Sequence, residues 1–170
     1  MTLRSRGDTS TELRPPARVA ERWRRILAPA VGRPFTTRGV EIACRLAKSS
    51  GATLYLVFIL EVPRTFGLDS SLSDEESQAK QVLEAAAAAA ARFKITLITR
   101  VHRVRSARDG ILAFINEQEI DLLVLGARPD EADGLPRELS RELFLTAPCE
   151  IVMDYIAGER QEPMEEDEEE

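Results

Sequence analysis

Short apolar runs alternate with amphipathic or alanine-rich stretches through the middle of the chain. Residues 53–60 (TLYLVFIL) form a continuous apolar run rich in β-forming residues, which is typical of a strand covered on both faces. The same kind of pattern, in shorter form, predicts four further strands, at 26–30, 95–102, 121–125 and 151–155. Each is bounded by polar residues, glycine or proline, so five separate strands are expected.

Helical patterns separate these strands. A helix is expected to run from Thr36 or Thr37, either of which can cap it, to Lys48, with Gly51 ending it. Ser73 and Glu76 have the spacing of a capping box, which predicts the start of a long helix reaching about Arg92. Alanine fills positions 85–91 of this helix, which favours close packing on a sheet. Two shorter helices are expected at 109–118 and 137–145.

Strands that alternate with helices predict the α/β class. We expect a single domain with a five-stranded, mostly parallel sheet, right-handed crossovers and helices on both faces. Ligands of such sheets bind beyond the carboxyl ends of the strands, where the strand order reverses. Four loops should therefore gather at one edge of the sheet: 30–35, 60–71, 103–109 and 126–136.

Charge divides the chain into three parts. Residues 1–22 are expected to be a basic mobile arm, 23–156 the folded α/β domain, and 157–170 a disordered acidic tail. The first 25 residues carry +4 and the last 14 carry −7, out of a net charge of −6. The folded part is therefore nearly neutral, which argues against a nucleic-acid-binding surface.

Composition excludes several other classes. No apolar run approaches the ~20 residues needed to span a bilayer, so no direct membrane insertion is expected. The arginines near the N-terminus are not followed by an apolar stretch, so they do not form a secretory signal. Cys44 and Cys149 are interpreted as buried free thiols, which fits a cytoplasmic protein. A single histidine, His102, and the lack of a Cys/His cluster argue against a zinc site.

Four segments resemble the universal stress protein family. Residues 25–32 (RILAPAVG) are similar to its first strand and 51–58 (GATLYLVF) to its second. Residues 121–126 (DLLVLG) and 147–149 (APC) match its fourth strand and its last helix-to-strand junction. The resemblance extends over about 25–155. It implies a five-stranded fold of the adenine nucleotide alpha hydrolase-like type, which is commonly dimeric and has nucleotide-binding and non-binding branches.

The residues that mark the binding branch are mostly absent. Binding members carry an Asp at the end of the first strand, which contacts adenine, and a Gly-x2-Gly-x9-Gly-Ser/Thr loop around the phosphates. The Asp position is Val31 here, Gly126 matches the first loop glycine, and the second falls on Pro129. The final pair falls on 139–140 (Leu-Ser) by strict spacing, or on 137–138 (Arg-Glu) counted back from 147–148.

These differences remove several contacts at once. Val31 cannot accept a hydrogen bond from adenine, Pro129 lacks an N–H donor, and Glu138 at a helix N-terminus would repel phosphate. We therefore expect no ATP binding tighter than about millimolar and no resident cofactor. Residues of a vestigial pocket would be Gly32, Gly126, Arg128 and Ser140.

Other candidate chemistry is limited. Four arginines near the end of the third strand could form an anion-binding patch at the edge of the pocket or a solvated, ion-paired face: Arg100, Arg103, Arg105 and Arg108. The loop acids Asp130, Glu131 and Asp133 are interpreted as solvated. No nucleophile, histidine and acid are arranged as in a hydrolase, so we expect a protein that is not an enzyme.

The sequence thus favours a non-catalytic stress-response or regulatory protein that acts through dimerisation and binding to partner proteins. The last strand, 150–155, should lie at the edge of the sheet, and we expect a homodimer that uses Ile151, Met153 and Tyr155. One alternative is a sensor of ATP, AMP or another anion that uses Gly126 and the arginine patch. Another is an accessory regulatory subunit of a membrane transporter.

Overall fold

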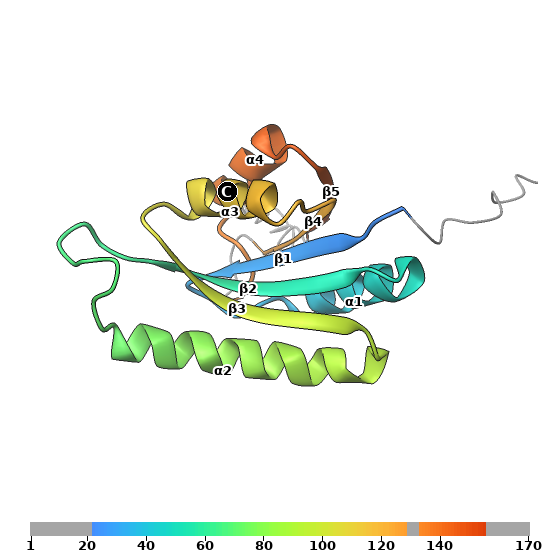
Figure 1. Cartoon of the computed structure of the whole chain (residues 1–170), viewed down its shortest axis with the longest axis horizontal. Coiled ribbons are helices and arrows are strands. Elements are labelled where there is room, and N and C mark those ends of the chain that lie inside the picture. The colour runs from blue at the N-terminus through green and yellow to red at the C-terminus, as the bar shows by residue number, and fades with distance from the viewer. Residues whose placement is uncertain (1–21, 129–132, 156–170) are drawn as a thin grey trace, which may run out of the picture.

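Five parallel strands form one sheet in the order β3-β2-β1-β4-β5, with helices on both faces (Figure 1). The structure is a computed structural model and describes residues 22–128 and 133–155. The strands are β1 (Arg25–Val31), β2 (Thr53–Glu61), β3 (Thr96–Val104), β4 (Leu122–Ala127) and β5 (Glu150–Tyr155). The helices are α1 (Thr37–Ser50), α2 (Ser73–Ala90), α3 (Ala107–Glu117) and α4 (Arg137–Thr146), with a 3₁₀ turn, η1 (Ala91–Phe93), after α2.

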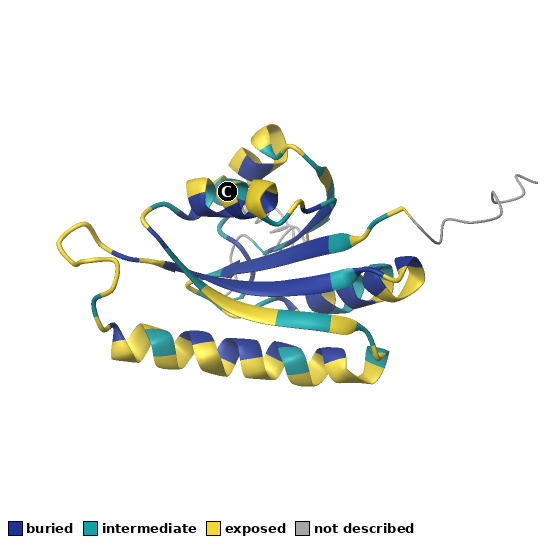
Figure 2. Ribbon diagram, viewed as in Figure 1, coloured by how far each residue is buried: buried dark blue, intermediate teal, exposed yellow. Residues whose placement is uncertain are grey.

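The sheet separates two hydrophobic cores. One lies under α1 and α2 and contains Cys44, Leu54 and Phe58. The other lies under α3 and α4 and contains Leu27 and Phe114. Figure 2 shows β1 and β2 buried along most of their length, as the continuous apolar runs predict. The expected single-domain α/β fold and the edge position of β5 are confirmed.

Element ends lie within two residues of those expected from the sequence, and two helix starts show how the ends are fixed. Ser106 caps α3 by accepting a hydrogen bond from the Asp109 N–H, so this helix begins two residues earlier than expected. The capping box proposed at Ser73 is wrong, because Ser73 is already helical and Leu72 occupies the cap position without a side-chain bond. Leu72 is buried in the core, and this burial rather than a cap fixes where α2 starts.

The pairing of β1 with β4 is short. β1 pairs with β2 over its whole length, from Arg25 opposite Thr53 to Val31 opposite Ile59. Between β1 and β4 only two pairs form, Ile26 with Leu122 and Leu27 with Leu123. The two strands therefore diverge towards their carboxyl ends, at the point where the strand order reverses and α/β proteins bind ligands.

No helix in the described part of the chain is long and apolar enough to cross a membrane.

Candidate functional site

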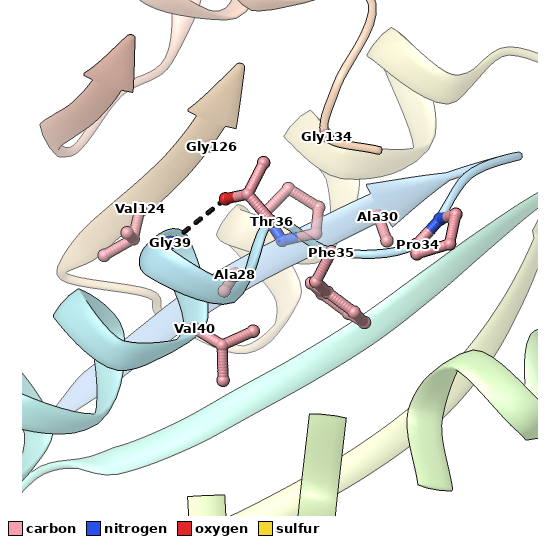
Figure 3. Close-up of a pocket in the computed structure, with 11 residues that line it drawn as sticks. Ala28, Ala30, Pro34, Phe35, Thr36, Gly39, Val40, Val124, Gly126 and Gly134 are labelled. Atoms are coloured by element: carbon pink, nitrogen blue, oxygen red, sulfur yellow. Dashed lines mark hydrogen bonds between the residues drawn. The ribbon is translucent and has the colours of Figure 1, made fainter. Parts of the chain in front are cut away.

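The crevice between the carboxyl ends of β1 and β4 is the first place to look for a ligand. Figure 3 shows its walls, which come from β1, β4 and the start of α1. They include Ala28, Ala30, Pro34, Phe35, Thr36, Gly39, Val40, Val124, Gly126 and Gly134. These residues leave a cavity of only about 10 Å³. That volume is about the least that can hold one water molecule.

Thr36 lines this crevice and is buried in it. The residue is 3% exposed, and its Oγ1 accepts a hydrogen bond of 3.0 Å from the Gly39 N–H, which caps α1 (Figure 3). A Cβ atom on Gly126 would lie 2.3 Å from Thr36 Oγ1, and one on Gly39 would lie 2.5 Å from it. Both glycines are therefore required here because any larger residue would collide with the threonine.

The segment that follows the undescribed residues 129–132 closes the crevice from the other side. The Gly134 N–H donates to the Pro34 carbonyl, and the Leu135 N–H donates to the Gly126 carbonyl, both at 2.8 Å. A Cβ atom on Gly134 would lie 2.9 Å from both the Gly126 carbonyl oxygen and Thr36 Cγ2. These two N–H groups and two carbonyls beside the crevice are thus bonded within the chain.

Two positions at the end of β1 have structural roles. Gly32 has a φ of 63°, which favours glycine, and a Cβ there would meet no atom within 4 Å. Its role is therefore the turn after β1, where its carbonyl accepts a hydrogen bond from Gln78 Nε2. Val31, at the position of the adenine-contacting Asp, packs against the core under α3 and α4.

At the start of α4, the sequence-predicted hydroxyl is already engaged. Ser140 is buried, and its Oγ donates to the Pro136 carbonyl at 3.1 Å. Arg137 and Glu138 are exposed on the first turn, and Pro136 offers no side-chain cap. The expectations for Pro129, Asp130 and Glu131 lie outside the described residues, while Asp133 is half-buried.

Arg128 is the one vestigial candidate with an unmet hydrogen-bonding group in the described chain. Its Nε atom is buried and has no hydrogen-bond partner among the described residues. The residue follows β4 directly, and its backbone N lies 3.3 Å from where a Cβ on Gly134 would stand, so its backbone borders the crevice. A buried donor without a partner is costly, which makes this side chain a candidate contact for an anion.

The arginine patch is not part of the crevice, and its expected position at the pocket edge is wrong. β3 is an edge strand, and β2 lies between it and β1. Arg103 instead holds the loop before α2, through Glu76 and the Leu68 and Ser70 carbonyls. Arg105 donates to the carbonyls of Val62, Pro63 and Phe66. The sequence could not predict this, because it does not specify which strand is next to β1.

The other two arginines and the histidine also have partners. Arg108 pairs with Asp109 at 3.2 Å. The Arg100 guanidinium lies 5.8 Å from the centre of the Phe114 ring, and the His102 ring packs edge-on against the same ring at 5.6 Å. No described group of three or more His, Cys, Asp or Glu residues could hold a metal ion.

The cysteines are free thiols. Cys44, on the buried side of α1, is fully buried, and burial raises the pKa of its thiol to about 11. Cys149 is half-buried before β5, and burial raises the pKa of this thiol too. Thiols with raised pKa values are poor nucleophiles at neutral pH, so neither is suited to catalysis.

Known structures share this fold. The universal stress protein from Archaeoglobus fulgidus is 18% identical, with 76% of this chain and 97% of that chain covered and a TM-score of 0.61. The structure of the universal stress protein from Archaeoglobus fulgidus in complex with dAMP is 17% identical, with 78% and 98% covered and a TM-score of 0.62. Universal stress protein UspA from Lactobacillus plantarum is 19% identical, with 78% and 97% covered and a TM-score of 0.61.

Among curated proteins, no sequence matches this chain. The model of the universal stress protein family matches residues 22–153, which is most of the chain and all five strands but for the end of β5. Fold, strand order and family match agree, and the chain belongs to the universal stress protein family.

Proposed function

We propose that this universal stress protein acts through dimerisation and binding to partner proteins, without binding ATP in the β1–β4 crevice and without catalysis of its own. The observation that carries the proposal is the packing of Thr36 against Gly39, Gly126 and Gly134. In nucleotide-binding members of the family, the loop glycine at the position of Gly126 lies beside phosphate. In this chain Gly126 lies beside the Thr36 side chain. The free thiols of Cys44 and Cys149 support a place in the reducing cytoplasm.

Room for a nucleotide would have to be created. Small-molecule sites usually measure ≈ 300–1,000 Å³, whereas the described residues leave about 10 Å³. To open the crevice, the Thr36 side chain would have to leave it, and the bonds from Gly134 to Pro34 and from Leu135 to Gly126 would have to break. The Val31 side chain offers no acceptor for adenine to compensate for these losses.

Calorimetric titration tests this proposal. We expect the full chain to bind neither ATP with magnesium nor AMP more tightly than about millimolar. The Archaeoglobus fulgidus protein, whose structure holds dAMP, serves as the positive control, titrated with dAMP under the same conditions. A micromolar dissociation constant for this chain would reject the proposal.

The surface that supports dimerisation spans β5 and α4. Phe144, Leu145 and Tyr155 are 60%, 69% and 46% exposed. A largely apolar hollow of about 420 Å³ lies beside them, lined by Ala127, Arg137, Ser140, Arg141, Phe144, Met153 and Tyr155. Ile151 and Met153 pack partly against the domain's own core. The proposed interface therefore rests on Tyr155 and on the α4 residues more than the sequence indicated.

Light scattering at micromolar concentration tests the dimer. We expect twice the mass of the chain, and the monomer mass for the double variant Phe144→Glu, Tyr155→Glu, because two buried carboxylates per subunit would oppose association. Phe66→Glu is the matched control, since Phe66 is 50% exposed but lies in the loop before α2. A monomeric wild type would exclude this part of the proposal.

A second candidate function is an anion sensor, and the unpartnered Nε of Arg128 favours it. The same titration distinguishes it, with inorganic phosphate as the ligand and Arg128→Gln as the variant. Binding of phosphate that disappears in this variant would support the sensor. Equal heats for the two proteins would exclude it.

A further inference from the structure

The outer edge of β3 is open. All nine residues of this strand pair with β2, from Thr96 opposite Thr53 to Val104 opposite Glu61, and no other described strand pairs with its far side. Thr99, Arg100 and Val101 are exposed, and Figure 2 shows this exposure over the middle of the strand. A long edge without a bulge presents N–H and C=O groups that a further strand can pair with.

A groove runs beside this edge. Helix α2 lies along β3 (Figure 1), and a largely apolar hollow of about 460 Å³ lies between them. It is lined by Lys80, Leu83, Glu84 and Ala87 from α2 and by Thr99, Arg100 and Val101 from β3. An open strand next to a helix is a setting in which extended peptides bind by adding a strand to a sheet.

The two sides of β3 differ in chemistry. Val101 lines the groove with Leu83 and Ala87, on the side of α2. The Arg100 guanidinium lies against Phe114 of α3, on the opposite face of the sheet. Paired residues of neighbouring strands share a face, and successive residues alternate between faces. An added strand would therefore place one residue against the apolar groove and the next beside Arg100.

The positive charge of Arg100 indicates which residues an added strand should carry. Arg100 has no carboxylate partner among the described residues, and β3 itself contains no acid. An acidic residue opposite Arg100 is therefore favoured.

Two other occupants fit less well. Arg100 is the central residue of Thr96–Val104, so antiparallel pairing of two β3 strands about a two-fold axis would set Arg100 against its own copy. Like charges directly opposite one another destabilise a sheet. The acidic segment 157–170 has only one large apolar residue, Met164, so it cannot supply alternating side chains for the groove.

We propose that the groove between β3 and α2 binds an extended peptide of alternating apolar and acidic residues from a partner protein, as a sixth strand of the sheet. This site is independent of the β1–β4 crevice and of the β5 edge.

Two blocked ten-residue peptides test the site with the full chain, one alternating valine and glutamate, the other valine and lysine. By fluorescence anisotropy we expect micromolar binding of the glutamate peptide, at least about tenfold tighter than of the lysine peptide. Arg100→Glu should reverse the preference, and Lys48→Glu, the same charge change at an exposed site on α1, should leave it unchanged. Arg100→Gln, which only removes the charge, serves as a milder variant whose fold is checked by circular dichroism.

Hydrogen exchange locates the bound peptide. We expect slower exchange of backbone amides within 96–104 when the glutamate peptide is present. Four results would overturn the proposal: no binding at millimolar peptide, equal binding of the two peptides, binding without protection of β3, or protection of β3 that rises with protein concentration in the absence of peptide. The last would identify a second copy as the occupant.

Discussion

Thr36 combines two structural roles in one side chain. Its hydroxyl oxygen caps α1 through the Gly39 N–H, and its methyl group lies against the Gly134 segment. Gly39, Gly126 and Gly134 all lie against it, and a Cβ atom on any of them would collide with it. A residue that could have been only a helix cap therefore also determines the shape of the crevice between β1 and β4.

Adding one methyl group to Gly126 should test this packing. We expect Gly126→Ala to lower the free energy of unfolding by about 1–3 kcal/mol, because the new Cβ would lie 2.3 Å from Thr36 Oγ1. Thr36→Ala alone should cost about 1 kcal/mol through the lost cap. In the double variant the collision is absent, so the two costs should not add. Additive losses in urea unfolding would contradict this packing.

Cys44 should make stability depend on alkaline pH. Its folded pKa, about 11, is raised from 9.0 by burial, so the thiol stays protonated in the folded state when the unfolded chain already ionises. Its contribution to stability is complete below pH 9 and is lost as the pH rises from 9 through 11. Urea unfolding of wild type and Cys44→Ala over this range measures it, and the variant should show the shallower decline. Parallel curves would mean that the thiol contributes nothing.

At the residue scale, the sequence predicted the roles of single residues better than it predicted which residues they contact in the folded protein. Thr36 was a candidate cap, and Gly126 was recognised as a loop glycine, but 90 positions separate them and no periodicity connects them. The orphan Nε of Arg128 likewise depends on burial by the folded chain. Sequence patterns predict contacts between residues that are close in the sequence, whereas the crevice is built from residues that are far apart in the sequence.

Elements were predicted well because their patterns are long and distinct in composition. The apolar run of β2 is rich in β-forming residues and bounded like a strand, and the alanine run of α2 has the highest helix propensity. Helix starts were less certain, because a buried residue such as Leu72 can fix an end without a capping side chain. The assignment of the arginines to the pocket failed for a different reason, since strand order is a property of the whole sheet.

Alanines on the two sides of α2 should respond differently to the same substitution. Ala79 is fully buried against the sheet, whereas Ala88 is exposed. We expect Ala79→Leu to destabilise the protein by about 1–3 kcal/mol through overpacking. Ala88→Leu should change stability by less than about 0.5 kcal/mol. Similar melting temperatures for the two variants would contradict the orientation of α2.

At the scale of the whole molecule, the two cores are built from residues between Trp23 and Met153. Every described strand and helix contributes to one or both of them. The expected basic arm 1–22 and acidic tail 157–170 lie outside the described residues, except for Arg22, which pairs with Glu150 at 2.7 Å.

A truncated protein should therefore fold. For residues 22–155 alone we expect a free energy of unfolding within about 1 kcal/mol of the full chain, which corresponds to a shift of a few degrees in melting temperature. Scanning calorimetry of both proteins measures it. A much lower melting temperature would show that one of the removed segments is structural.

The short contact between β1 and β4 has a consequence for local stability. Only two residue pairs join β1 to β4 in the described sheet. Asp121 reinforces this joint, because its carboxylate accepts from the Arg24 and Arg25 N–H groups at 2.8 and 2.9 Å and its own N–H donates to the Arg25 carbonyl at 2.9 Å. We therefore expect the segment from β4 to β5 to open as a cooperative unit while the other strands stay paired. In native-state hydrogen exchange, amides of β4 and β5 should exchange through openings of lower free energy than those of β2. Asp121→Asn, which weakens the joint, should lower the opening free energy further for β4 and β5. The opening free energies of β2 and β3 should stay unchanged. The sheet would then open first between β1 and β4 and not at all of its strands together.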